Sequence, residues 1–372
     1  MISSFLFYKY KNKIHFGIKS VFCFYFVWVI LVLEKFGLNL FNIEQLVTYA
    51  GFFILIFSSY FVIVLVDDFF QKFVKIIYYL SIISLPLFFL QLVVPNIIFA
   101  VNSLLSRINP SFLGYGGEGY SNSIFFTFRT DQHLYRNCGF SWEPGAFGFF
   151  LVIALLIHLT IKSNRNIDKI LIVLILTIVT TFSTTAYLGL LVGIIYYNFN
   201  TGEIKKTVIY GLLSVPIIIF IVNQSFMKDK IESIFYYDTN TYIVERDIQY
   251  AQKTGGTFSA NRFASFLIDF RYFISDPLLG RGLNENTRNS NQTQNINYSN
   301  GLSDLLVKFG IFGFILYFLL ISISIKKLNN LYKIKYPSIV VLGIVIVGFS
   351  ETLLYTPLLF SIQYFYFKDI QK

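Results

Sequence analysis

The stretch that decides the fold runs from Ile170 to Tyr197 and reads ILIVLILTIVTTFSTTAYLGLLVGIIYY. It is apolar at both ends and polar at Phe182–Thr185. One straight helix over these residues would be about 42 Å long at 1.5 Å per residue, which exceeds a hydrocarbon core of about 30 Å. Lys169 precedes the stretch and Lys205 follows it, and basic residues gather in cytoplasmic loops. We therefore predict two short membrane helices joined by a turn at Phe182–Thr185, with both ends in the cytoplasm.

The whole chain has the composition of a membrane protein. Of its residues 55% are hydrophobic and 13% are charged, and its mean hydropathy is +0.63. An ordinary soluble domain has about 25% charged residues. The net charge of +10 could suit nucleic acid, but apolar segments divide the basic residues into small clusters. This is the positive-inside pattern of a membrane protein, so we expect no nucleic-acid partner.

Nine apolar segments predict about ten membrane spans, because Ile170–Tyr197 counts twice. We expect one all-α integral membrane domain over residues 1–372, with an uncleaved signal anchor and both termini in the cytoplasm. The nine segments are Ile18–Leu33, Val47–Val66, Ile76–Val94, Ala146–Ile161, Ile170–Tyr197, Val208–Val222, Leu305–Ile325, Ser338–Phe349 and Leu358–Phe367.

Two long connections fall on the outer side in this topology, at residues 95–145 and 223–301. Loops of this length usually have a function. The cytoplasmic side has sixteen lysines and one arginine, Arg165, whereas the outer loops have three lysines and eight arginines. The outer arginines are Arg107, Arg129, Arg136, Arg246, Arg262, Arg271, Arg281 and Arg288.

This separation of arginine from lysine indicates an outer surface that binds phosphate. A guanidinium group is a planar fork that binds phosphate through two hydrogen bonds, whereas lysine offers a point charge. The same loops have eleven acidic residues, so ion pairing within the protein is the alternative for any single arginine. For the set as a whole, we favour a phosphate or diphosphate at the level of the lipid headgroups.

The first outer loop ends in the motif RNCGFSWEPG, Arg136–Gly145. Proline suits the first turn of a helix, so Pro144 predicts that a spanning helix begins there. Glu143 would then lie near the cap, beside the positive end of the helix dipole. Two roles stay open for this carboxylate. It could be the general base for a sugar hydroxyl, or it could cap the helix and orient Arg136.

This motif resembles the R-x-x-G-F-x-x-E-P-G pattern of bacterial O-antigen and capsular polysaccharide polymerases. Further similarities follow in the order and topology of that family, and together they cover roughly residues 130–320. They are the Ser-Thr turn Phe182–Tyr187, NRF at Asn261–Phe263, DPLLGRG at Asp276–Gly282, GLSDLL at Gly301–Leu306 and FGIFG at Phe309–Gly313.

The resemblance implies a metal-independent glycosyltransferase of the membrane-embedded GT-C-like type, without a cofactor. Such enzymes lie in the bacterial cytoplasmic membrane and make O-antigen, capsule or exopolysaccharide at its outer face. They transfer a growing glycan from a polyprenyl diphosphate to a hydroxyl of the next lipid-linked repeat unit. The implied partners are the polyprenyl-diphosphate-linked oligosaccharide, the lipid bilayer, a chain-length regulator and a flippase.

The resemblance also suggests roles for single residues. Arg136 and Arg262 would clamp the diphosphate, and Glu143 would orient or act as base. If Ala260–Ile274 is a helix, Arg262 and Arg271 are nine residues apart and point to opposite faces, so they cannot grip one diphosphate. The remaining residues that we expect to bind substrate are Arg271, Arg281, Arg129, His133 and Trp142.

Two other functions remain as alternatives. O-antigen ligases usually have a His-Asn pair before the span that follows the second loop, but this chain has Asn297–Asn300 there and no histidine in that loop. This disfavours a ligase and leaves the base unassigned. A flippase or transporter for lipid-linked sugars would have charges within its spans and short loops. The nearly uncharged spans and long outer loops favour a polymerase.

Overall fold

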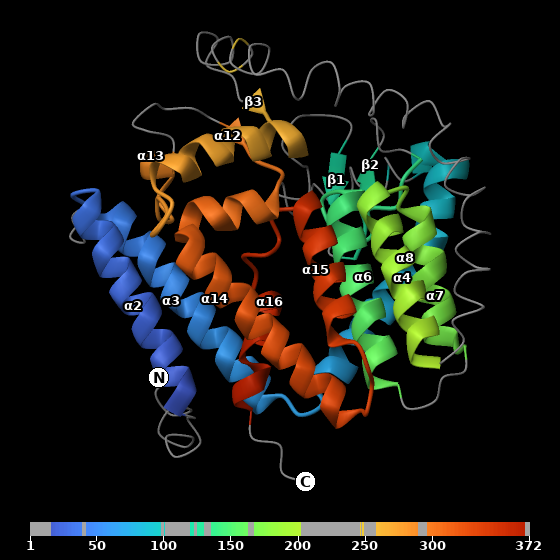
Figure 1. The fold of residues 1–372 in the computed structure, drawn as a ribbon. Coiled ribbons are helices and arrows are strands. Elements are labelled where there is room, and N and C mark those ends of the chain that lie inside the picture. The colour runs from blue at the N-terminus through green and yellow to red at the C-terminus, as the bar shows by residue number, and fades with distance from the viewer. Residues whose placement is uncertain are drawn as a thin grey trace. The chain divides into compact units, whose positions relative to one another are not determined.

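The computed structural model describes residues 16–38, 42–97, 100, 120–122, 125–129, 135–162, 167–201, 246, 248, 258–288 and 296–368. The predicted span Val208–Val222, His133 and most of both predicted outer loops lie outside the described residues. Figure 1 labels the described helices and strands, and the chain divides into two compact units. The first unit comprises residues 1–67, 225–327 and 354–372, and the second comprises residues 68–224 and 328–353.

The second unit is built around one buried helix. The described helices of this unit are α4 (Phe69–Val93), α6 (Pro144–Ile161), α7 (Lys169–Thr180), α8 (Thr184–Thr201) and α15 (Pro337–Ser350). Helices α4, α7, α8 and α15 all pack against α6. Of an apolar stretch of 18 residues in α6, 83% is buried inside the protein, against 28% of the corresponding stretch in α4. Helix α6 is therefore the core on which the unit is assembled. A short antiparallel pair, β1 (Tyr120–Asn122) and β2 (Thr127–Arg129), belongs to the same unit.

The turn predicted within Ile170–Tyr197 is confirmed. Helix α7 ends at Thr180 and α8 begins at Thr184. Phe182 between them has a φ of 47°, a left-handed conformation that reverses the chain and that non-glycine residues seldom adopt. The Tyr187 hydroxyl donates to the Val179 carbonyl at 2.8 Å and so joins the two helices across the turn. Two short helices replace the single long one because the polar turn residues find partners there.

The first unit has an aromatic core and a helical cover. Its longer helices are α2 (Phe16–Lys35), α3 (Ile43–Leu65), α12 (Arg262–Ser275), α14 (Gly301–Leu331) and α16 (Pro357–Tyr364), which the 3-10 turn η4 (Phe365–Phe367) extends. Shorter elements are α13 (Glu285–Arg288) and the parallel pair β3 (Phe258–Ser259) and β4 (Ile296–Asn297). The Phe52 ring packs against those of Tyr25, Trp28 and Phe309, which joins α3 to α2 and α14.

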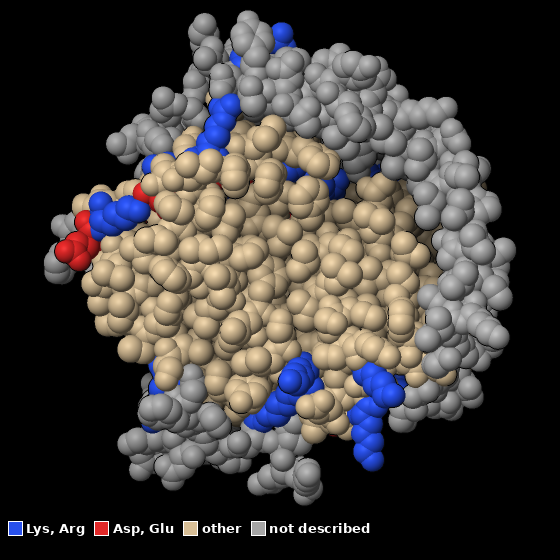
Figure 2. Space-filling model, viewed as in Figure 1, with Lys and Arg blue, Asp and Glu red and all other residues tan. Residues whose placement is uncertain are grey.

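Four described helices are long and apolar enough to cross a membrane by length and composition, namely α3, α4, α6 and α14, and α7 and α15 are shorter apolar helices. Most of the described surface in Figure 2 is uncharged. These features confirm an all-α membrane protein. Every predicted span within the described residues corresponds to a helix, although the last one ends as a 3-10 turn after Tyr364. The count of ten spans and the orientation in the membrane stay predictions.

Candidate functional site

The candidate site in the second unit begins where helix α6 begins. Pro144 occupies the first helical position and Glu143 is the N-cap residue, as the sequence predicts. The Glu143 carbonyl accepts the first helical hydrogen bond, from the Phe147 N–H at 3.1 Å. The Glu143 side chain makes no capping hydrogen bond, so the hypothesis that its carboxylate caps the helix is wrong. The extended backbone at Glu143 serves as the cap instead, which leaves this half-buried carboxylate beside the positive end of α6.

The residues before this cap are attached to the end of α7. The Arg136 Nε donates to the Thr181 carbonyl at 3.2 Å, and the Asn137 N–H donates to the Thr180 carbonyl at 2.9 Å. The buried Asn137 amide also donates to the Thr180 hydroxyl at 2.9 Å. Arg136 is half-buried. The Arg136 side chain is therefore attached through its Nε to the turn between α7 and α8.

The backbone conformation at residue 139 explains why the RNCGFSWEPG motif has a glycine at this position. It has a φ of 51°, and a Cβ atom there would lie 2.5 Å from the Phe147 ring. The Gly139 N–H donates a hydrogen bond to the Asn137 side-chain oxygen at 2.9 Å. Only glycine combines this backbone with such a close approach. The motif is thus a tight loop that presents Arg136 and Glu143 at one end of the unit.

A row of hydroxyl groups leads from the same turn to a buried carboxylate that the sequence analysis missed. Ser183 and Thr185 are in contact at 3.2 Å, and Thr185 donates to Ser350 at 2.8 Å. Ser350, the last residue of α15, donates to the Glu351 carboxylate at 3.3 Å. Glu351 is 3% exposed. A sequence signal for it exists, because Glu351 is the sole charged residue between Lys335 and Lys368. An ionisable residue in so apolar a stretch is a functional candidate.

The first unit presents Arg262 and Arg271 on α12. Asn261 caps this helix, accepting hydrogen bonds from the backbone N–H groups of Phe263 and Ala264 at 3.2 and 3.0 Å. Arg262 is the first helical residue and is half-buried, whereas Arg271 is exposed. Helical geometry over Arg262–Ser275 is confirmed, so the two arginines lie about half a turn apart on the helix.

Arg288 has a structural role that its position in the sequence did not reveal. Its guanidinium is buried between the carboxylates of Asp269 and Asp304, at 2.6 Å from the former. Lys308 pairs with Asp304 at 2.8 Å, and the Ser303 hydroxyl donates to Asp269 at 2.6 Å. Burial lowers the pKa of Arg288, but the two carboxylates raise it more, so the net pKa shift is upward and the group stays charged. This cluster ties α12 to the start of α14.

Arg281 also has partners within the protein. Its Nε lies 3.4 Å from an Asp276 oxygen, and its guanidinium lies over the rings of Tyr272 and Phe36 at 5.0 and 5.9 Å. Lys35 pairs with Asp276 at 2.6 Å. Both arginines of the 281–288 segment therefore contact acids or rings of their own unit. This favours, for these two positions, the ion-pairing alternative to phosphate binding.

The DPLLGRG motif forms a loop that docks on a kink in α14. The Arg281 and Gly282 N–H groups donate to the carbonyls of Val307 and Lys308 at 2.7 and 3.1 Å. A Cβ atom on Gly280 would lie 2.5 Å from the Gly310 nitrogen, and one on Gly310 would overlap the carbonyl of Leu278. Gly280 and Gly310 both have positive φ, 72° and 63°. The glycines of the DPLLGRG and FGIFG motifs therefore allow two backbones to touch.

The remaining predicted substrate contacts are Trp142, Arg129 and His133. Trp142 lies next to the α6 cap and is 47% exposed. Arg129 is the last residue of β2, and its side chain lies outside the described residues, as does the whole of His133. Among the described residues, no group of three His, Cys, Asp or Glu side chains could hold a metal ion.

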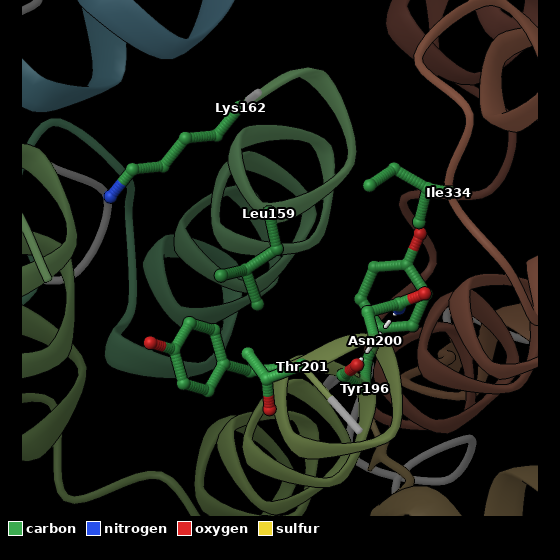
Figure 3. Close-up of a pocket in the computed structure, with 7 residues that line it drawn as sticks. Leu159, Lys162, Tyr196, Asn200, Thr201 and Ile334 are labelled. Atoms are coloured by element: carbon green, nitrogen blue, oxygen red, sulfur yellow. Dashed lines mark hydrogen bonds between the residues drawn. The ribbon is translucent and has the colours of Figure 1, made fainter. Parts of the chain in front are cut away.

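A small pocket lies at the C-terminal end of α6, next to Leu159 and Lys162 (Figure 3). Its lining comprises Leu159, Lys162, Tyr196, Tyr197, Asn200, Thr201 and Ile334. Helix α6 has 18 residues, so at 1.5 Å per residue its two ends are about 27 Å apart. Lys162 pairs with Asp168 at 3.0 Å. The pocket is therefore separate from the site at the α6 cap.

Residues 170–318 match the family model described as O-antigen ligase. The match confirms the resemblance to the O-antigen ligase and polymerase superfamily. It includes the turn between α7 and α8, helix α12 and the loop docked on the α14 kink, whereas Arg136, Glu143 and Glu351 lie outside the matched residues. Comparisons with curated proteins and with solved structures found no match.

Proposed function

We propose that this protein belongs to the O-antigen ligase and polymerase superfamily, which part of its sequence resembles, and that it polymerises polyprenyl-diphosphate-linked repeat units at the outer face of the cytoplasmic membrane. The observation that carries the proposal is Arg136, held against the α7–α8 turn beside the N-terminus of α6. A guanidinium and a helix N-terminus both favour a multiply charged phosphate group. The diphosphate of a lipid-linked sugar lies at the headgroup level, where spanning helices end.

The proposed chemistry is displacement at the anomeric carbon. A hydroxyl of the incoming lipid-linked unit attacks the reducing-end sugar of the growing chain, and the bond to the diphosphate breaks. Negative charge grows on the leaving diphosphate, so a fixed guanidinium stabilises the transition state more than the ground state. Arg136 has this role in our proposal, and Arg262 stays a second predicted phosphate contact. No step requires a metal ion.

The acceptor distinguishes polymerase from ligase. A polymerase joins a glycan to another lipid-linked repeat unit, whereas a ligase joins it to a lipid core. The family description names the ligase, and the ligase histidine is missing from the second outer loop. Because this histidine is missing, we favour the polymerase.

The test is a reconstitution that offers both acceptors. Purified protein in vesicles would receive the host's polyprenyl-diphosphate oligosaccharide, with and without the host's lipid core, and products would be sized on a gel. We expect a ladder at repeat-unit intervals without the core. Product only when the core is present would identify a ligase. Movement of intact lipid-linked sugar across the bilayer, with no new bond, would identify a flippase and overturn the proposal.

A further inference from the structure

We infer that Glu351 is the terminal proton acceptor of the transfer reaction and receives the sugar hydroxyl's proton through Ser350 and Thr185. This inference rests on the proposed function and supplies the base that the sequence left unassigned. A carboxylate that is removed from water is retained in a protein where hydrogen bonds or ion pairs offset the cost of its burial. Glu351 is 3% exposed, in a stretch of more than thirty residues without another charge.

The hydrogen bonds along the hydroxyl row all run in one direction. Each hydroxyl has a single proton to donate and two lone pairs to accept with. Ser350 donates its proton to Glu351, and Thr185 donates its proton to Ser350. The contact between Ser183 and Thr185 at 3.2 Å must then have Ser183 as its donor. All three hydroxyl protons therefore point along the row toward the carboxylate, as in a proton relay.

The row also has an accessible end. Ser350 and Glu351 are buried, but Thr185 is only partly buried. Thr185 lies at the α8 end of the α7–α8 turn, four residues after Thr181, whose carbonyl holds Arg136. The relay therefore starts on the same turn as the guanidinium that we assign to the diphosphate. Glu351 acts through Ser350 and Thr185, which makes it a proton-accepting and positioning residue at a distance from the sugar.

The proposed step balances. The sugar hydroxyl gives its proton to Thr185, Thr185 gives its own to Ser350, and Ser350 gives its own to Glu351. The sugar oxygen forms the new glycosidic bond as the bond from carbon to phosphate oxygen breaks, and that electron pair leaves with the diphosphate. Neutral Glu351 then returns its proton to water. No oxidant, reductant or metal takes part.

The test measures the initial rate of joining two repeat units in vesicles as a function of pH. In the wild type the rate should fall about tenfold per pH unit below the pKa of the base. Glu351→Gln should lower kcat at least about 100-fold and abolish this acid limb, with KM for the lipid-linked donor unchanged. Glu351→Asp should recover part of kcat with a displaced acid limb.

Variants of Thr185 separate a relay from a structural role. Thr185→Val keeps the shape but has no hydroxyl, so kcat should fall at least about tenfold, whereas Thr185→Ser should stay within about threefold of the wild type. Thr160→Val is the matched control, because Thr160 is a buried threonine near the other end of α6, bonded to Tyr196 at 3.0 Å. It should leave kcat unchanged. If Glu351→Gln does not fold, the two Thr185 variants carry the test.

Three results would overturn the inference while leaving the polymerase intact. One is that Glu351→Gln shows the same fall in rate at low pH as the wild type. Another is equal activity of Thr185→Val and Thr185→Ser. The third is loss of the acid limb in Glu143→Gln, which would make Glu143 the base. Absence of any ladder in the wild type would refute the proposed function instead.

Discussion

At the scale of single residues, the outer arginines separate into two kinds. Arg288 and Arg281 contact acids and rings of their own unit, whereas Arg136 is anchored by a carbonyl next to a helix N-terminus. Sequence alone could not make this distinction. The partners of Arg288 are 16 and 19 residues away along the chain, and only the fold brings them together. The excess of outer arginine was visible in the sequence, but the use of each guanidinium was not.

Arg288→Met should destabilise the first unit. It removes the shared cation and leaves the buried Asp269 and Asp304 side by side, a loss of about 3–5 kcal/mol for breaking a buried pair. The midpoint of thermal unfolding in detergent measures the effect. Arg271→Met at an exposed position of α12 is the control and should change stability by no more than about 0.5 kcal/mol. Equal midpoints for the two variants would contradict a structural role for Arg288.

Removing one of the two buried carboxylates as well should restore part of the stability that Arg288→Met loses. In Arg288→Met combined with Asp269→Asn, one buried charge disappears together with its partner. We expect the double variant to be more stable than Arg288→Met alone, because an unpaired buried carboxylate costs more than a neutral amide. The midpoint of thermal unfolding again decides. A double variant less stable than the single one would show that Asp269 contributes through other contacts.

At the scale of elements, apolar runs and breaking residues predicted most of the helices. The turn at Phe182–Thr185 and the start of α6 at Pro144 follow from hydropathy and proline position, whereas helix α12 entered the sequence analysis only as a condition. The kink at Gly310 does not follow from the sequence, because a single glycine within an apolar run weakens a helix without showing that the helix breaks there. It arises where the DPLLGRG loop presses its backbone against α14. Glu351 was predictable in principle as a lone charge in an apolar stretch, whereas its hydroxyl row forms only where two segments far apart in the sequence meet, residues 183–185 and residues 350–351.

Gly280→Ala should disrupt the loop on α14. The added Cβ meets the Gly310 nitrogen at 2.5 Å, and the φ of 72° is strained for alanine. We expect a loss of at least about 1–3 kcal/mol in stability. Gly51→Ala is the matched control, because a Cβ atom at this position on α3 has nothing within 4 Å. It should leave the unfolding midpoint unchanged or raise it. Indistinguishable midpoints for both variants would contradict the docking role.

At the scale of the whole molecule, the topology remains to be tested. Basic residues predict that both termini and residue 163 lie in the cytoplasm and that residues 95–145 and 223–301 lie outside. Cysteines that replace Ser163 and Ser290 should therefore differ in their labelling by a thiol reagent in intact cells. A membrane-impermeant thiol reagent should label Ser290→Cys but not Ser163→Cys, and both should react after the membrane is opened. The wild type, with Cys23 and Cys138, gives the background. Labelling of Ser163→Cys in intact cells would reverse the predicted orientation.

The central claim is that a fixed guanidinium at Arg136 serves glycan transfer from a polyprenyl diphosphate. The most direct measurement compares wild type and Arg136→Lys in vesicles supplied with lipid-linked oligosaccharide as sole substrate, and follows the ladder over time. Lysine keeps the charge and loses the planar fork. We expect a ladder at repeat-unit intervals from the wild type and a rate on the order of 100-fold lower from Arg136→Lys. An equally fast ladder from Arg136→Lys, or no ladder from the wild type, would contradict the account.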